Sequence, residues 1–539
     1  MRNGMSGKTT CRHAPGAAAW VSASAVALPA HAHGFGQRYD LPVPLWLYLA
    51  GAGATVAVSF LMMALFLRAT PRLENYPRVD LLKWRIGRVL AHRYILSLCR
   101  VLAMALFVLI LLAGFFGRQS VFKNIAPVMV WAIWWVGMAY VSALLGNLWA
   151  LVNPLATAFA WAEAVYFRLR RGAALSLKLT YPERLGMWPA VALFFAFTWM
   201  ELVSEHGDMP ANLAAAVLLY AAITWCGMFL FGRDPWLRRG EAFSLVFGLL
   251  ARFAPTEVRV VNAQVCAACV DPHCRGAEGC VNCYACFSRA RKADREWNLR
   301  PYAAGLLSDR PVPPSMLMLI LLMLAAVTFD GFIETPLWSS LVDWLGAGPP
   351  NASAPPLGGN SRALIYTFGL IVFPILLLAI YLAFSWLIAH IAAAGSSQAE
   401  RDGRRYTAAS LAGLFVVTLI PIAIAYHLAH YLSFLFMAGQ YLIPLASDPF
   451  GYGWDLLGTA RYFVRIGIID ARLVWYTSVA AIVIGHVAAV YLAHAMALRI
   501  FKDKQTALRS QYPMLALMVG YTMVSLWIIA QPVVSSRFG

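Results

Sequence analysis

The chain has 539 residues, of which 61% are hydrophobic and 13% charged, and its mean hydropathy is +0.65. This composition excludes a soluble multidomain protein and predicts a chain that crosses a membrane many times. The formal net charge of +18 does not indicate nucleic acid, because most Lys and Arg residues lie in loops on alternate sides of the apolar segments. That is the positive-inside pattern. The basic loops are residues 68–100, 168–184, 233–310, 401–405 and 499–509.

The first 32 residues have the pattern of a secretory signal peptide. Basic residues occur at Arg2, Lys8 and Arg12, a mostly apolar run follows, and Ala30-His31-Ala32 matches a cleavage site between small residues. An uncleaved start is the alternative. Together with the basic loops, the signal predicts a multi-pass protein of the bacterial inner membrane with both mature termini in the periplasm.

Ten apolar segments follow, each long enough to cross a hydrocarbon core of about 30 Å. We expect an all-α polytopic membrane protein with about ten transmembrane helices and a cytoplasmic Cys-rich metal-binding loop. The predicted spans are 44–67, 101–117, 126–150, 187–204, 211–232, 314–335, 363–393, 407–437, 474–498 and 512–532.

The predicted organisation has four parts. A signal peptide (1–32) precedes transmembrane helices 1–5 (33–232), a cytoplasmic loop (233–312) and transmembrane helices 6–10 (313–539). Two further segments do not span. Residues 147–167 are predicted to be interfacial or re-entrant, with a break at Asn153-Pro154, and residues 241–253 to form an amphipathic helix on the cytoplasmic face.

Six of the nine cysteines lie in the long basic loop, at Cys266, Cys269, Cys274, Cys280, Cys283 and Cys286. The cytoplasm is reducing, so clustered thiolates there indicate a metal rather than disulfides. Two C-x2-C pairs, Cys266/Cys269 and Cys283/Cys286, favour tetrahedral zinc. The C-x2-C-x2-C run that ends at Cys286 keeps an iron–sulfur cluster open as the alternative. Both ligand sets indicate a metal, and structural zinc is the simpler interpretation.

The segment Pro421–Phe436 is apolar enough for a bilayer but carries His427 and His430. On a helix, a separation of three residues places both imidazoles on one face. Pro421 predicts a kink just before them. Ionisable side chains inside a membrane usually face a cavity or a partner. The alternative is that they only join neighbouring helices by hydrogen bonds.

Three more polar residues lie at similar depths in other predicted spans: Glu201, Asp330 and His486. With His427 and His430 they could share one cavity in the outer half of the membrane. Three imidazoles with one or two carboxylates would suit zinc, iron or manganese. We therefore predict His427, His430 and His486 as ligands of a divalent metal, and Asp330 and Glu201 as catalytic candidates, Asp330 being a ligand candidate as well.

Such a site predicts one of three chemistries. A metal with an open position would supply hydroxide, and Asp330 or Glu201 would act as a base or orient the water. Alternatively, two histidines such as His427 and His486 would ligate a haem iron, and an iron–sulfur centre in the loop would then favour electron transfer. The third interpretation is a proton-coupled transporter, in which Asp330 and the histidines relay protons.

Five stretches resemble the bacterial integral-membrane fenitrothion hydrolase family, and they are distributed over nearly the whole mature chain. They are Ala32–Trp46, Tyr181–Val203, Phe329–Trp338, Tyr426–Tyr431 and Gly485–Arg499. The resemblance implies hydrolysis of an organophosphorus triester with release of a nitrophenol. It brings no list of catalytic residues.

The sequence-based interpretation is a membrane-embedded, metal-dependent hydrolase of lipophilic organophosphorus triesters. Such neutral esters partition into lipid and could enter a membrane cavity from the side, while metal-bound hydroxide attacks phosphorus. The expected partners are this lipophilic small molecule and the lipid bilayer, without nucleic acid, and a second membrane subunit is left open. An electron-transfer protein and a transporter are the alternatives.

Overall fold

A computed structural model of the protein describes residues 39–66, 76–267, 275–276, 279–307, 310–346, 361–394, 400–401, 404–501 and 503–535. The described chain is mostly helical, and ten of its helices are long and apolar enough to cross a membrane. This number and the order of the spans confirm the prediction. The predicted signal peptide lies outside the described residues.

The spans agree with the predicted segments to within several residues at most ends. They are α1 (Leu45–Phe66), α3 (Arg93–Phe116), α4–η3–α5 (Ile125–Leu144), η4–α8 (Glu183–Leu202), α9 (Pro210–Phe231), α14 (Pro314–Ile333), α16 (Ser361–Ala394), α17–η8–α18–η9–α19 (Ala408–Ser447), α20 (Ala471–Ile500) and α21–α22 (Lys504–Val533). Within the composite spans, the elements used below are η3 (Val128–Gly137), α5 (Met138–Leu144), α8 (Trp188–Leu202), η8 (Val416–Leu419), α18 (Ile420–Ala438), α21 (Lys504–Arg509) and α22 (Tyr512–Val533).

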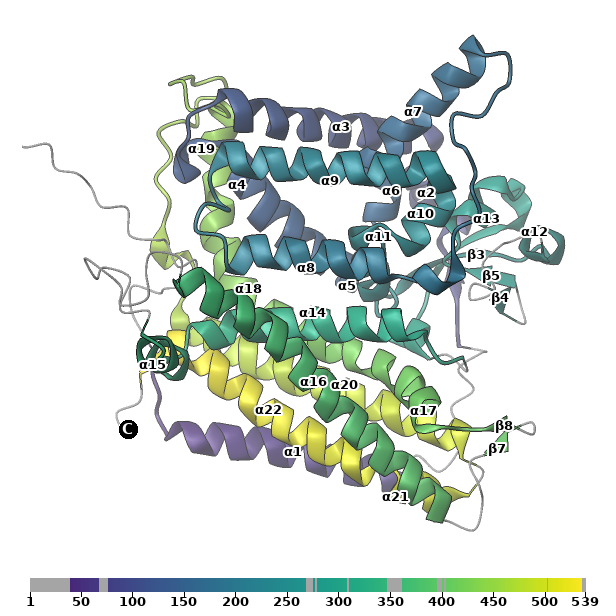
Figure 1. Cartoon of the computed structure of the whole chain (residues 1–539), viewed down its shortest axis with the longest axis vertical. Helices are drawn as coiled ribbons and strands as arrows, with labels where there is room; N and C mark the ends of the chain where they lie inside the picture. Colours follow the sequence, from purple (N-terminus) through teal and green to yellow (C-terminus); the bar gives the residue numbers. More distant parts are fainter. Residues whose placement is uncertain are drawn as a thin grey trace, which may run out of the picture.

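The spans form two groups that meet along a seam (Figure 1). Among spans two to five, α3 packs against α9, the short α4 (Ile125–Pro127) packs against both, and Trp135 of η3 contacts Phe194 and Phe197 of α8, whereas spans six to ten pack together around α18, α20 and α22. The first span, α1, packs against α20 and α22, so it belongs with the second group and not with the helices that follow it in sequence. At the seam, α14 lies against α8, and α18 lies against η3.

Burial identifies the central helices of the structure. The apolar window of α14 is 83% buried and that of the span containing α18 is 78% buried, whereas α3 is 6% and α16 11% buried. The peripheral helices therefore present apolar side chains outward, as expected for surfaces that face lipid. Of the side chains predicted to form a site, Glu201, Asp330, His427 and His430 lie on the helices of the seam, whereas His486 lies on α20.

The basic segments lie at one end of the helices (Figure 1). Two short helices, α2 (Arg85–Leu90) and α10 (Arg233–Arg239), lie there together with α21 and the hairpin β7–β8 (Glu400–Arg401 and Arg404–Arg405). This agrees with the alternation of basic loops. The identification of this end as cytoplasmic stays a prediction.

The predicted Cys-rich loop forms a small lobe at this end, with a five-stranded antiparallel sheet in the order β2-β6-β3-β5-β4. Its strands are β2 (Val79–Asp80), β3 (Thr256–Val260), β4 (Arg275–Gly276), β5 (Gly279–Val281) and β6 (Arg295–Leu299). Short helices α12 (Ala263–Ala267) and α13 (Tyr284–Arg289) flank it. The all-α prediction is therefore wrong for this part, because the turns between the cysteines let short strands pair.

The buried carboxylate of Glu257 ties the lobe together. It accepts hydrogen bonds from Arg300 at 2.7 Å and Arg78 at 2.8 Å, and from the Tyr76 hydroxyl at 2.6 Å. Burial, followed by the hydrogen bond to Glu257, raises the pKa of Tyr76, so its hydroxyl stays a donor at neutral pH. Glu257 thereby joins Tyr76 and Arg78, which precede the second span, to the strands that follow the fifth span.

Two predicted non-spanning segments have different outcomes. The break at Asn153-Pro154 is confirmed, because Asn153 separates α6 (Trp149–Val152) from α7 (Pro154–Leu169) and caps the latter. The prediction that residues 241–253 form an amphipathic helix on the surface is wrong. Helix α11 (Ala242–Leu250) buries six of its nine residues against α5 and α8, because its apolar residues surround most of the helix. Directly after the sixth span, the chain forms a further short helix, α15 (Pro336–Trp344).

Replacing Glu257 by Gln tests the lobe clamp. Loss of the charge leaves the buried Arg300 guanidinium without its counter-charge and weakens the contact of the partly buried Arg78, so the lobe should lose about 3 kcal/mol of local stability. Glu296→Gln is the matched control, because its contact with Arg259 is 3.4 Å and partly exposed, and it should cost under about 1 kcal/mol. Hydrogen exchange of peptides from 256–299, followed by mass spectrometry, measures both. If the backbone amides of these peptides were equally protected from exchange in both variants, Glu257 would not stabilise the lobe as proposed.

Candidate functional site

Helix α18 carries the side chains from which the candidate site is built. His427 and His430 are one turn apart, as predicted, and Tyr431 follows four residues after His427. The helix begins directly after the 3-10 segment η8, with Pro421 as its second residue. The helix before the histidines is therefore irregular where the kink at Pro421 was predicted, in the form of a 3-10 segment.

Asp330 on α14 is the residue that joins this helix to its neighbour. Its Oδ2 lies 2.8 Å from Nε2 of His430 and accepts a hydrogen bond of 2.6 Å from the Tyr431 hydroxyl. All three side chains are nine-tenths or more buried. A buried carboxylate in a membrane is costly unless donors surround it, so these two contacts are what allows Asp330 to remain there.

Glu201 on α8 extends the same network across the seam. Its Oε1 accepts hydrogen bonds from the Trp135 indole at 2.8 Å and from the Tyr431 hydroxyl at 3.2 Å. Trp135 lies in η3, a ten-residue π-helical segment. The wider turn of a π-helix shifts the side chains that follow it, and such segments are frequent at functional sites. Five side chains thus form one continuous chain, Trp135–Glu201–Tyr431–Asp330–His430, which we call the polar chain.

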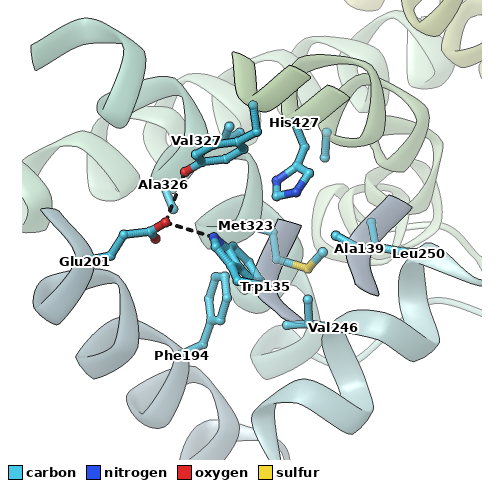
Figure 2. Close-up of a pocket in the computed structure, with 12 residues that line it drawn as sticks. Trp135, Ala139, Phe194, Glu201, Val246, Leu250, Met323, Ala326, Val327 and His427 are labelled. Carbon is cyan, nitrogen blue, oxygen red and sulfur yellow. Dashed lines mark hydrogen bonds between the residues drawn. The ribbon is translucent and has the colours of Figure 1, made fainter. Parts of the chain in front are cut away.

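A small cavity lies beside the polar chain (Figure 2). Its volume, measured as the space open to the centre of a water-sized molecule, is about 30 Å³. A water molecule needs roughly 10–15 Å³ on this measure, so the cavity has room for one or two. Glu201, Tyr431 and His427 supply the polar lining, and Trp135, Phe194 and Met323 are among the apolar residues.

His427 points into this cavity from α18 (Figure 2). Its Nε2 is buried and has no hydrogen-bond partner within the described chain. Leaving a buried polar atom unpaired costs about 1–3 kcal/mol. The position of Nε2 is therefore suited to a water molecule in the cavity.

His486 lies apart from the other predicted ligands. Its Nδ1 is 2.8 Å from the carbonyl of Ile482, and its ring contacts Tyr521 with 6.0 Å between ring centres. Tyr521 in turn is bonded to Thr328 at 2.5 Å. His486 thus belongs to a second polar group between α14, α20 and α22. The prediction that one cavity gathers all five residues is wrong: Glu201 and His427 line it, whereas Asp330, His430 and His486 are not among its lining residues.

The arrangement does not resemble a metal centre. Within the described residues, no three side chains of His, Cys, Asp or Glu are grouped so that they could hold a metal ion. The Asp330 carboxylate is occupied by His430 and Tyr431, and His427 faces the cavity instead of Asp330. The predicted divalent metal at His427, His430 and His486 therefore has no support from this geometry.

Four of the six clustered cysteines are described: Cys266, Cys280, Cys283 and Cys286. All are buried and share one small core of the lobe with Val260. Cys269 and Cys274 lie outside the described residues. The prediction that the cysteine segment gathers its thiols in one place agrees with these four, but no three of them are placed as metal ligands within the described chain. The cysteine metal site stays a prediction.

Two members of the polar chain were missed from the sequence. Tyr431 lies in the same motif as the histidines, and its spacing of four from His427 could have identified it. Trp135 could not be identified from the sequence, because tryptophan is common in apolar spans. The π-helical segment that positions it also has no recognisable periodicity of apolar residues.

Comparisons with known proteins add no assignment to this geometry. No protein-family model, curated protein or solved structure matches the chain. The resemblance to the fenitrothion hydrolases therefore stays an expectation, and the function has to be argued from the site.

Proposed function

We propose that the protein handles protons within the membrane, as a proton-coupled transporter, and that the polar chain is its proton-binding site. The observation that carries this proposal is the unbroken series of contacts from Glu201 through Tyr431 and Asp330 to His430, at 3.2, 2.6 and 2.8 Å. Chains of acids, hydroxyls and imidazoles in apolar surroundings are the usual means of moving protons inside membranes.

Hydrogen-bond accounting supports a mobile proton. The Tyr431 hydroxyl faces one oxygen of Asp330 and one of Glu201, yet a hydroxyl has a single proton to donate. The second contact is satisfied when one of the carboxyl groups carries a proton of its own. The polar chain can therefore hold a proton on either acid while Tyr431 turns between them, and it keeps its hydrogen bonds in both states.

The position of the polar chain supports coupling to movement. Glu201 and Trp135 belong to the first group of helices, whereas Asp330, His430 and Tyr431 belong to the second. A proton that arrives or leaves changes the charge exactly where the two groups touch. Transporters commonly bind their coupling ion near the middle of the membrane, between two units that rock against each other.

Proton flux into liposomes tests this proposal. The purified chain is reconstituted into vesicles that contain a pH-sensitive dye, and a potassium gradient with valinomycin supplies the driving potential. The polar chain should conduct a proton leak even without the co-transported molecule, so wild-type protein should acidify the interior faster than protein-free vesicles, and Asp330→Asn should reduce the protein-dependent rate about tenfold or more. Asp343→Asn, an exposed acid on α15, is the control and should transport normally. A wild type that matches empty vesicles, or an Asp330→Asn that matches the wild type, would sink the proposal.

A second candidate is hydrolysis of lipophilic organophosphorus triesters, the activity that the resemblance implies. The observation in its favour is the unpaired Nε2 of His427 beside a cavity with room for water. An imidazole in that position is a suitable general base for water, with Glu201 and Tyr431 nearby. A cavity of about 30 Å³ is too small for the ester itself, so this candidate requires that the seam opens.

Release of nitrophenol from a nitrophenyl phosphotriester measures this second candidate. Purified protein in detergent should turn the ester over, and His427→Gln should lower the rate by about 10² or more, the usual contribution of a general base. His390→Gln is the control, since His390 stacks on Trp386 away from the cavity. If the ester is stable in the presence of wild-type protein, or if His427→Gln is fully active, the candidate is rejected.

Three other predictions stay as proposals. A zinc ion or an iron–sulfur cluster at the cysteines is supported by the burial of Cys266, Cys280, Cys283 and Cys286 in one core. Residence in a bacterial inner membrane, with periplasmic termini, is supported by the basic segments at one end of the helices. The partners proposed are the lipid bilayer and a small molecule that moves with the proton, without nucleic acid.

A further inference from the structure

A second, smaller cavity continues from the first toward the lobe. Its volume on the same measure is about 10 Å³. The two cavities share Ala139, Leu250 and His427 in their linings, so they meet beside His427. The second is also lined by Tyr140, Ala143 and Leu144, which follow α5 to its last residue. The pair of cavities therefore marks a line from the polar chain to the lobe end of the third span.

The lobe is attached to the chain at the end of this line. The Tyr302 hydroxyl donates to the carbonyl of Leu144 at 2.9 Å, and the Thr256 hydroxyl donates to the carbonyl of Leu145 at 2.5 Å. Gly146 follows with a φ of +147°. A side chain added there would overlap the Thr256 hydroxyl, so glycine permits the close approach of the lobe. Two of the last carbonyls of α5, which a helix end leaves unpaired, are thus satisfied by the lobe.

One strand connects this attachment to the cysteine core. Thr256 is the first residue of β3, and Val260 is its last. Val260 pairs with Cys280 across the sheet, and its carbonyl lies 3.5 Å from the sulfur of Cys266. Between them, Glu257 is fixed by the buried contacts described above. The five residues of β3 therefore connect the cysteine core directly to the end of α5.

We propose that water and protons reach His427 from the lobe end, through the second cavity, and that the lobe is the cover of its mouth. A volume of about 10 Å³ is close to the minimum for one water molecule, so this route admits nothing larger while the cover is in place. The inference concerns access to the cavity and does not depend on whether the polar chain transfers protons.

Hydrogen–deuterium exchange of one buried thiol tests the route. Ala139→Cys places a thiol where both cavities meet, and infrared spectroscopy follows its S–H band after transfer of the purified protein into D2O, with the wild-type spectrum subtracted. The cover is then loosened by Thr256→Val and Tyr302→Phe, two changes that remove hydroxyl groups and little volume. Tyr452→Phe is the matched control, because Tyr452 makes the same kind of bond to a helix-end carbonyl, that of Phe116, in the outer loop after α19.

The expected result is slow exchange in the Ala139→Cys protein, several-fold faster exchange when the two lobe hydroxyls are removed, and no change with Tyr452→Phe. A thiol at position 139 that never exchanges would overturn the inference, as would lobe variants without effect or a Tyr452→Phe that accelerates exchange equally. Hydrogen exchange of the lobe peptides is recorded in parallel to show that the variants keep their fold. Proton flux in the earlier assay can fail without changing any of these outcomes.

Discussion

The carboxylate of Asp330 is the constraint on which the centre of this structure depends. A charge at this depth is tolerated only where donors replace water, and His430 and Tyr431 provide them. Tyr431 then brings Glu201, and Glu201 brings Trp135, so one buried acid determines how four helical segments face each other. The apolar packing around the seam supplies most of the burial, but it would allow other rotations of these helices, whereas the polar chain allows few.

Irregular helices make this arrangement geometrically accessible. The π-helical η3 carries Trp135, which donates to Glu201, and the 3-10 segment η8 lies directly before α18. Regular helices in the same places would present different faces to the seam, because each turn would advance by 3.6 residues. Irregular backbone in a membrane is tolerated where protein rather than lipid surrounds it, and both segments lie in heavily buried spans. Residues of η3 and α18 also line the small cavity beside His427.

The sequence predicted the spans well, because apolar length alone decides them. It also predicted the shared face of His427 and His430 from their spacing, and the depth that brings Asp330 to His430. It misplaced His486, because depth does not fix the rotation of a helix, and it missed Trp135, because η3 has no recognisable period. The prediction that residues 241–253 lie on the surface was also wrong. The few polar residues of this segment suggested an exposed face, but apolar residues on most sides of a helix indicate burial. The cysteine spacing predicted a common location for four of the six thiols but not the strands between them.

Glu201 and Asp330 come from different helix groups, and the Tyr431 hydroxyl contacts both. A double-mutant cycle measures the coupling between these two acids most directly, with Glu201→Gln, Asp330→Asn and the double variant unfolded at equilibrium in mixed detergent. The Tyr431 hydroxyl contacts an oxygen of each acid, so a coupling carried by this hydroxyl depends on it, whereas direct repulsion between the two buried acids does not. We predict a coupling of about 1 kcal/mol or more that falls when Tyr431 is replaced by Phe. Additivity within about 0.5 kcal/mol in the presence of Tyr431 would contradict this prediction.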